Sequence, residues 1–456
     1  MSKTRQYEDY IVELRNYEPG SEQYEIALTL PEGQGEPAPV RTQLNYAGME
    51  TALNDLEAKA LYLEDLVVLG GQFMDRLLPE GTMRNHLVNA VKRAGPDGGV
   101  RLRLQIREPR LAQIPWEYSY LKIHEGDAQR NHFLVVNPKI SLVRHPLLDE
   151  PASALAPADP SNLRMLAVFA NPESSSFRKL SLKTERRVLE KALGDFSVEG
   201  VKIQWQPLRE DVTIDELNQF LLAKPEIFHF SGHGQFKERD DQGTLVLLRG
   251  KEDKEADFLA AGDLALKVQA AGVRLVVLGA CESSRQQGRS PWTGVAPALV
   301  ARGAGAVIAM QYEVLDDMAI LFSQGFYRSL AAGLTVDEAV SIGRLAVLEK
   351  SSEKGVEWGV PTLYLRADGV LFPKLEERET ALGDQLRGVV QQIVDAIEGG
   401  SEVIGIEFKA GAVPGDYQVI QNVKVVKGGS RLVGITFDGT WPPGAQNTPD
   451  SEDGGP

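Results

Sequence analysis

Cysteine is almost absent from this chain of 456 residues, in which Cys281 is the one example. A single cysteine excludes a disulfide framework within the chain and argues against a zinc site built from cysteine clusters. We therefore expect a reducing, cytoplasmic setting for the protein. We also expect neither a bound metal nor any other cofactor.

Long apolar runs and excess positive charge are also lacking. No run approaches the roughly 18 apolar residues of a membrane span, and no apolar stretch follows the basic residues of Met1–Asp9, so we expect neither a membrane segment nor a secretory signal. The chain carries 49 Lys and Arg against 64 Asp and Glu, a net charge of −15. Because phosphate contacts need clustered basic residues, we expect no nucleic acid partner and no membrane partner.

Glycine-rich phosphate loops are missing as well, which weakens one alternative, a nucleotide-binding α/β protein. Such a protein carries Gly-x-Gly-x-x-Gly or Gly-x-x-x-x-Gly-Lys-Ser/Thr after the first strand of its parallel sheet. The corresponding strand here is Met165–Ala170, and neither loop follows it. Tight nucleotide binding would be needed to restore this alternative.

The length exceeds what one compact core usually holds, so we expect several domains. Residues 1–146 combine alternating strands at 24–30 and 100–106 with an interrupted helix over 64–94. A further short strand is predicted at 133–136. Together these features predict an N-terminal α+β domain.

The rest of the chain changes character twice. Residues 147–163 are rich in proline, alanine and acidic residues and are predicted to be a linker. Beyond them, 164–373 alternate apolar strands with helical stretches, which predicts an α/β domain with a mostly parallel sheet flanked by helices. The segment 376–441 predicts a small helix-plus-sheet α+β appendage, with its helix over 376–398, and 442–456 predict a disordered tail. No internal repeat is expected.

Two strands of the predicted parallel sheet end in small residues around one reactive side chain. One strand runs into Ser231-Gly232-His233-Gly234, and the next runs into Gly279-Ala280-Cys281. Functional groups gather at the carboxyl ends of parallel strands. The histidine and the cysteine lie about 50 positions apart, a spacing found in one class of cysteine protease. The pattern therefore predicts a catalytic pair of His233 and Cys281.

The chemistry of peptide cleavage explains why these residue types belong together. A thiolate attacks the amide carbonyl, and the amine leaves only when a general acid protonates it. Cys281 and His233 can fill these roles, and the backbone N–H groups of Gly234 and Cys281 are the predicted donors to the oxyanion. His229, which lies within the apolar strand, is more typical of a packed, hydrogen-bonded histidine.

At these residues the sequence resembles the CHAT family, caspase-like peptidases related to separase. The resemblance covers roughly residues 60–372. The matching segments are Ile114-Pro115-Trp116-Glu117, Ile227–Gly234, Leu278–Ser283, Gly294–Leu299, Gly303–Tyr312, Phe326–Leu330 and Thr335–Val340. It implies a caspase-like α/β sheet, a dyad of His233 and Cys281, and hydrolysis of peptide bonds.

Two departures qualify the resemblance. The tetratricopeptide repeats that often accompany CHAT domains are not found, and Gly279 stands where metacaspases that cut after basic residues carry an acid. An acidic substrate pocket would then come from the loop after the fifth strand, where Glu313 or Asp316 is expected to bind an Arg or Lys side chain. Asp316 has an alternative role, because acids at helix starts also cap the helix.

Two functions of different classes stay open. The first is a cysteine endopeptidase that makes specific cuts in a protein substrate encoded nearby, by family analogy in bacterial defence or programmed cell death. The second is a catalytically silent CHAT-like scaffold or signalling adaptor, which the intact His233 and Cys281 disfavour. An activator protein or ligand is an expected partner. Residues 376–441 are expected either to regulate or target the enzyme or to be an ordinary packing extension. Trp116 is expected to be buried in a structural role.

Overall fold

The computed structural model describes much of the chain up to residue 366 and four short strands beyond it. The chain divides into two compact units, one of residues 3–374 and one that combines residues 1–2 with 375–456. The described residues are 5–32, 34–123, 129–146, 163–173, 177, 180, 182–183, 186–187, 189–190, 203–205, 208–237, 242–252, 254–282, 292–312, 314, 316–351, 355–366, 388–394, 402–408, 417–423 and 431–437.

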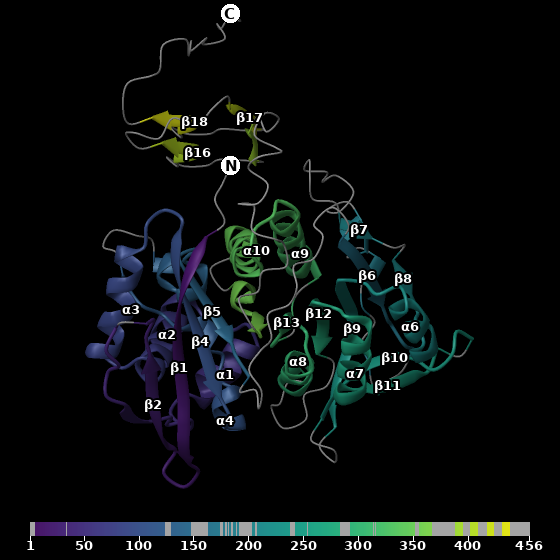
Figure 1. The fold of residues 1–456 in the computed structure, drawn as a ribbon, viewed down its shortest axis with the longest axis horizontal. Coiled ribbons are helices and arrows are strands. Elements are labelled where there is room, and N and C mark those ends of the chain that lie inside the picture. Colours follow the sequence, from purple (N-terminus) through teal and green to yellow (C-terminus); the bar gives the residue numbers. More distant parts are fainter. Residues whose placement is uncertain are drawn as a thin grey trace, which may run out of the picture. The chain divides into compact units, whose positions relative to one another are not determined.

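The N-terminal part of the larger unit contributes five strands to its sheet (Figure 1). In space they follow the order β3, β2, β1, β4, β5, and β1 pairs antiparallel with β2 but parallel with β4. Tyr10, Val12 and Leu14 of β1 are buried, as the period of two requires in a strand that faces the core on one side. The strands are β1 (Gln6–Glu18), β2 (Gln23–Thr29), β3 (Val40–Gln43), β4 (Gly98–Ile106) and β5 (Ile140–Arg144).

The helices of this part agree with the predicted helix over 64–94 and its interruption. That segment forms α2 (Leu63–Leu77) and α3 (Thr82–Arg93), and α1 (Glu50–Glu57) precedes them. Gly81 separates α2 from α3 with a φ of +119°, a backbone conformation that glycine adopts without steric cost.

The predicted strand at 133–136 is wrong. Leu134–Val136 forms the 3₁₀ helix η3, in which the backbone N–H of Asn137 donates to the carbonyl of Leu134 at 3.2 Å. All three side chains of η3 are buried. Because a short run that is buried on every side has no polar face, its sequence does not distinguish a strand from a turn of helix.

The C-terminal part of the larger unit confirms the predicted mostly parallel sheet flanked by helices. β6, β9, β12 and β13 pair in parallel, whereas β10, β11 and β14 join the sheet antiparallel. The strands are β6 (Leu163–Phe169), β7 (Ile203–Trp205), β8 (Arg209–Glu210), β9 (Ile227–Lys237), β10 (Gln242–Leu248), β11 (Ala256–Ala260), β12 (Leu275–Glu282), β13 (Ala306–Met310) and β14 (Pro361–Leu365). The main helices are α6 (Ile214–Leu221), α7 (Ala261–Ala271), α8 (Trp292–Ala301), α9 (Asp316–Ala331) and α10 (Val336–Lys350).

Alternate residues of the central strands enter two different hydrophobic cores. Ile227 of β9 and Val277 of β12 belong to a core that includes residues of α9 and α10. Phe228 and Phe230 of β9 belong to a second core, which includes residues of α6, α7 and α8. Helices thus cover both faces, which is why these strands read as almost continuous apolar runs.

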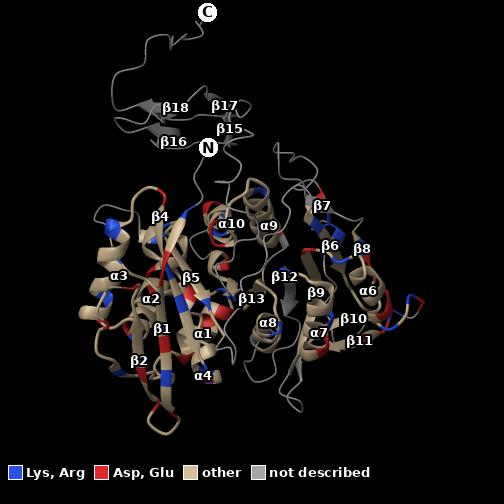
Figure 2. Cartoon of the chain, in the orientation of Figure 1, with Lys and Arg blue, Asp and Glu red and all other residues tan. Residues whose placement is uncertain are grey.

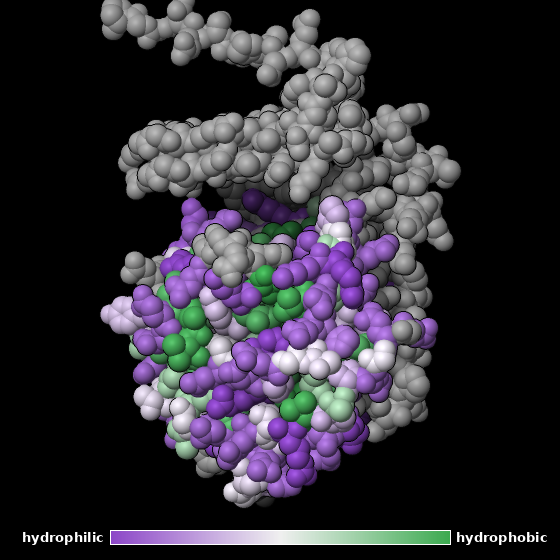
Figure 3. Space-filling model, turned by 90° about the vertical axis from the view of Figure 1, so that its left-hand side faces the viewer, coloured by the Kyte–Doolittle hydropathy of each residue, from purple (hydrophilic) through white to green (hydrophobic). Residues whose placement is uncertain are grey.

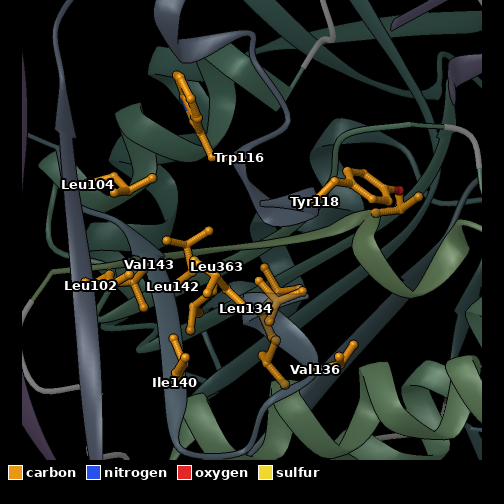
Figure 4. Close-up of a cluster of buried hydrophobic side chains, with 14 of the residues drawn as sticks. Leu102, Leu104, Trp116, Tyr118, Leu134, Val136, Ile140, Leu142, Val143 and Leu363 are labelled. Carbon is orange, nitrogen blue, oxygen red and sulfur yellow. The ribbon is translucent and has the colours of Figure 1, made fainter. Parts of the chain in front are cut away.

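One sheet runs through both parts of the larger unit. β5 pairs in parallel with β14, where Arg144 and Tyr364 are register partners, so the segments predicted as separate domains, 1–146 and 164–373, share a sheet. A buried cluster fills this junction (Figure 4). Its labelled members are Leu102, Leu104, Trp116, Tyr118, Leu134, Val136, Ile140, Leu142, Val143 and Leu363. Residues 147–162, most of the predicted linker, lie outside the described residues.

The predicted helix over 376–398 is wrong at residues 388–394, the part of it that the structure describes. The described strands of the smaller unit are β15 (Gly388–Val394), β16 (Glu402–Phe408), β17 (Tyr417–Val423) and β18 (Arg431–Phe437). In β15 the residues Val389, Val390, Ile393 and Val394 are β-branched, which favours a strand, and their spacing over seven residues fits a helix face equally well. Residues 376–387 and 442–456 lie outside the described residues.

The surface of the larger unit mixes charges of both signs. Basic and acidic residues are interspersed over its described elements (Figure 2), and many form exposed pairs such as Arg249 with Glu255. The face that carries α3 is mostly hydrophilic, with smaller apolar patches (Figure 3). Among the described helices, none combines the length and apolar character that crossing a bilayer requires.

Candidate functional site

His233 lies where β9 changes its neighbour on one side. β6 pairs with β9 as far as Phe169 and Ser231, and from His233 onward β10 takes its place, with Val246 opposite His233. The N–H of Ala170, just after β6, donates to the carbonyl of Ser231 at 3.0 Å. The histidine was predicted just past its strand, but pairing with β10 extends β9 to Lys237. His233 thus lies near the end of the pairing between β6 and β9, and open α/β sheets usually bind ligands at the carboxyl ends of their parallel strands.

Cys281 is the register partner of His233. The parallel pairing of β12 with β9 matches Cys281 with His233 and Glu282 with Gly234. Neighbouring strands lie about 4.8 Å apart, so the two backbones are adjacent at this level of the sheet. The pairing thus brings together the two residues of the predicted dyad, while the side chain of Cys281 and residues 283–291 lie outside the described part.

The side chain of Phe177 packs on the imidazole of His233. The ring of Phe177 stacks on the imidazole with centroids 5.0 Å apart and an interplanar angle of 28°, and it also contacts Phe258 of β11 at 6.4 Å. His233 is fully buried and Phe177 is 9% exposed. In this conformation the imidazole is therefore shielded from solvent.

His229, four residues earlier on β9, confirms the expectation of a packed histidine. Its Nδ1 lies 2.8 Å from the hydroxyl of Tyr327 on α9, and its ring contacts Phe169 of β6. The side chain is 1% exposed. Since it packs between the sheet and α9, its contacts account for its position without a role in chemistry.

The structure does not describe the side chains of the two acids that were predicted to form a substrate pocket. Glu313 and the side chain of Asp316 lie outside the described residues. The backbone of Asp316 begins α9, the place that its alternative role as a helix-start acid requires. Among the described residues, no group of three or more His, Cys, Asp or Glu residues could hold a metal ion.

The Pro115-Trp116-Glu117 motif builds the junction beside the site. Trp116 is fully buried, as expected, and its Nε1–H donates to the carbonyl of Leu111 at 2.9 Å. Glu117 is also fully buried and accepts two bonds from Arg144, at 3.0 and 2.8 Å. Burial opposes the carboxylate charge, but Arg144 outweighs it and lowers the pKa of Glu117.

Glu117 also bonds to a residue in the C-terminal part of the larger unit. The amide of Gln311, just after β13, donates to Glu117 at 3.2 Å and to the carbonyl of Gly359 at 3.0 Å. Sequence reasoning missed the Glu117–Arg144 pair, because the partners lie on separate elements and Arg144 stands in an apolar run. The apolar setting was the available signal, since a buried arginine needs a buried acid.

We expect Gly232→Ala to destabilise the packing between β9 and the end of β6, next to His233. A Cβ at this position would lie 2.9 Å from the backbone carbonyl of Ala170 and 2.6 Å from the ring of Phe230. The backbone oxygen cannot swing away as a side chain can, so the free energy of unfolding should fall by about 1–3 kcal/mol. Urea unfolding measures the change.

Gly262→Ala is the matched control. Gly262 lies in α7, and a Cβ there meets nothing within 4 Å. Since alanine favours helix, this variant should be as stable as the parent or slightly more stable. Equal stability of the Gly232→Ala variant and the parent would contradict the packing described for β6 and β9.

Comparisons with known proteins complete the description of the site. The CHAT domain family matches residues 76–383. Among solved structures, the Arg-specific cysteine proteinase gingipain R is 10% identical, with a TM-score of 0.39 over 71% of this chain and 76% of its own. A complex of the Porphyromonas gingivalis RgpB pro- and mature domains gives 12% identity and a TM-score of 0.36, over 71% and 78%. The separase–securin complex of Saccharomyces cerevisiae gives 10% identity and a TM-score of 0.43, over 78% of this chain and 30% of the matched chain. No curated protein matches the sequence.

Proposed function

The chain belongs to the CHAT domain family, and from this premise we propose that it is a cysteine endopeptidase with Cys281 as nucleophile and His233 as general acid and base. The observation that supports the proposal is the strand register, which pairs Cys281 with His233 on adjacent parallel strands. A thiol and an imidazole need this proximity to exchange a proton. The expected substrate is a protein encoded nearby, cut at few positions.

In the proposed reaction, the thiolate of Cys281 attacks the carbonyl carbon of a peptide bond, forming a C–S bond and an oxyanion. Backbone N–H groups of Gly234 and Cys281 stabilise that charge. His233 donates a proton to the leaving amine as the C–N bond breaks. Water, losing a proton to His233, then attacks the thioester and releases the carboxylic acid product and the thiolate.

The burial of His233 favours an enzyme that is restrained in the described conformation. Phe177 stacks on the imidazole, and a substrate that reaches His233 must move this ring. An activator protein or ligand that displaces Phe177 would expose the histidine. The proposed enzyme therefore responds to a signal instead of cleaving proteins indiscriminately.

A thiol-directed peptide electrophile tests the catalytic proposal. Because Cys281 is the one cysteine, a peptidyl acyloxymethyl ketone should form a single adduct there, which intact-mass analysis detects. Without the imidazole to form the thiolate, the His233→Ala variant should react at least about tenfold more slowly. Iodoacetamide, which carries no peptide, controls for simple exposure of the thiol.

The outcome separates the enzyme from the scaffold. Adduct formation that depends on His233, together with cuts in a protein encoded nearby, supports the endopeptidase. Equal labelling of the parent and His233→Ala chains, with no cleavage of any such protein, would favour a catalytically silent CHAT-like scaffold or signalling adaptor.

We further propose that Glu313 or Asp316 binds a basic side chain before the scissile bond. A carboxylate in the pocket forms a charge-assisted pair with Arg or Lys, so these residues should be preferred over Leu, Met or Asp by at least about tenfold. A panel of fluorogenic peptides measures the preference. Glu313→Gln or Asp316→Asn should remove it, whereas equal or better cleavage after Leu in the parent would overturn the assignment.

A further inference from the structure

The strand pairing of the smaller unit reveals a tandem repeat. β15 pairs in parallel with β17, matching Gly388 with Tyr417, and β16 pairs in parallel with β18, matching Glu402 with Arg431. Both registers are therefore offset by the same 29 residues. We call residues 388–408 repeat 1 and residues 417–437 repeat 2, and the described strands of the two repeats pair in register.

The sequences of the two repeats agree with this stacking. At the offset of 29 they are identical at nine of 21 positions, which corrects the expectation of no internal repeat. The conserved residues of repeat 1 are Val390, Gln392, Val394, Gly399, Gly400, Ser401, Gly405, Ile406 and Phe408. The repeat was not predicted because it occurs only twice and its other positions all differ. Each repeat is thus a template on which an equivalent copy pairs residue for residue.

Charged positions give the stack a direction. Glu402 and Arg431 are register partners of opposite sign. In the sequence alone, the same offset joins Asp395 to Lys424, Glu398 to Lys427 and Lys409 to Asp438. Register partners in parallel strands lie about 4.8 Å apart, so repeat 1 on repeat 1 would oppose like charges, whereas repeat 1 on repeat 2 opposes unlike ones.

The stack within one chain uses only one edge of each strand. Among the described residues, the smaller unit forms two sheets of two strands each, β15 with β17 and β16 with β18. The second edge of each strand therefore has no described neighbour within the unit. A row of backbone N–H and C=O groups at such an edge is a template for another strand.

We propose that the smaller unit is a self-assembly module whose partner is a second copy of this chain. Repeat 1 of the incoming copy stacks on repeat 2 of the first, in parallel and in register, and repeats the internal contact between chains. The charge pattern selects this order, since it again places repeat 1 against repeat 2. Such a contact joins unlike surfaces and does not close on itself, so it builds open filaments. The inference does not depend on peptidase activity.

The full chain is the material for the test. Sedimentation velocity and electron microscopy at rising concentration should show filaments, and their X-ray diffraction should show the strand spacing of about 4.7–4.8 Å. Ile406→Pro, which removes a donor from the ladder of β16, should abolish them. Ile406→Val, which keeps a β-branched residue, is the matched control and should assemble as the parent does.

Charge exchange tests the proposed order. Glu402→Arg alone should raise the concentration needed for assembly by about tenfold, because it opposes Arg431. Adding Arg431→Glu to it should restore assembly of that variant with itself. Mixed with the parent, the double variant should form separate filaments, since both mixed contacts oppose like charges.

A chain that stays monomeric to about 100 μM would overturn the proposal, because the contact between copies would then be too weak to hold a filament together. Assembly that persists equally in the Ile406→Pro variant would overturn it too, by placing the contact elsewhere. Should Ile406→Pro only unfold the smaller unit, the Glu402→Arg and Arg431→Glu variants still test the ordered stack. Failure of Arg431→Glu to rescue Glu402→Arg, or free mixing of the double variant with the parent, excludes the ordered stack.

Discussion

Replacing Cys281 by alanine is expected to lower kcat/KM for peptide cleavage by at least about 10⁴-fold. The chain holds no second thiol that could take over the attack on the carbonyl carbon. Without a nucleophile, the bound substrate can react only with water. Initial rates on the substrate found for the parent chain, at several concentrations, measure the loss.

The two histidines of β9 provide a matched pair for the same assay. His233→Ala should lower kcat/KM by about 10²- to 10⁴-fold through the loss of general acid–base catalysis. His229→Gln should act mainly on stability, because it removes the bond to Tyr327, worth about 1 kcal/mol. Cleavage that survives Cys281→Ala, or that falls more in the His229→Gln variant than in the His233→Ala variant, would contradict the proposed dyad.

Arg144→Met is expected to lower the free energy of unfolding by about 3–5 kcal/mol. The change leaves the carboxylate of Glu117 buried without its paired guanidinium, and only the bond from the amide of Gln311 and the electrostatic influence of Arg344 remain among the described residues. It also removes the donors that Arg144 gives to the carbonyls of Ala112 and Ile114. The shift of the urea midpoint at neutral pH, with the slope unchanged, measures the loss.

Two further variants show whether the uncompensated charge causes that loss. Combining Arg144→Met with Glu117→Met should recover part of the stability, because apolar residues can replace a buried ion pair once both charges are gone. Arg249→Met removes one partner of an exposed pair and should leave the midpoint unchanged. A midpoint of the Arg144→Met variant that equals the parent's would contradict a structural role for the pair.

Much of the larger unit could be predicted because its signals are local. Apolar runs separated by helical stretches predict the parallel sheet, and the small residues around His233 and Cys281 single out these two side chains. The extension of β9 to Lys237 could not be predicted, since small and polar residues become a strand there through pairing with β10. The stacking of Phe177 on His233 likewise depends on a distant segment.

The two errors in secondary structure share one physical cause, which is that short apolar patterns are ambiguous. The apolar run that forms η3 has no polar face to set its period, so tertiary packing selects a 3₁₀ helix. In β15 the apolar spacing fits a helix, but parallel pairing with β17 decides for a strand. The partnership of Glu117 with Arg144 joins separate elements, and no local pattern encodes it.

The continuous sheet determines how this protein can be divided by an engineer or by evolution. A cut after residue 146 would remove β5 from β14, a strand of five buried residues, and expose its edge together with the apolar cluster of the junction. An open, apolar edge recruits strands from other molecules and leads to aggregation. The half that carries His233 and Cys281 is therefore not expected to fold as a separate domain. A stable fusion protein must contain β1 through β14 together.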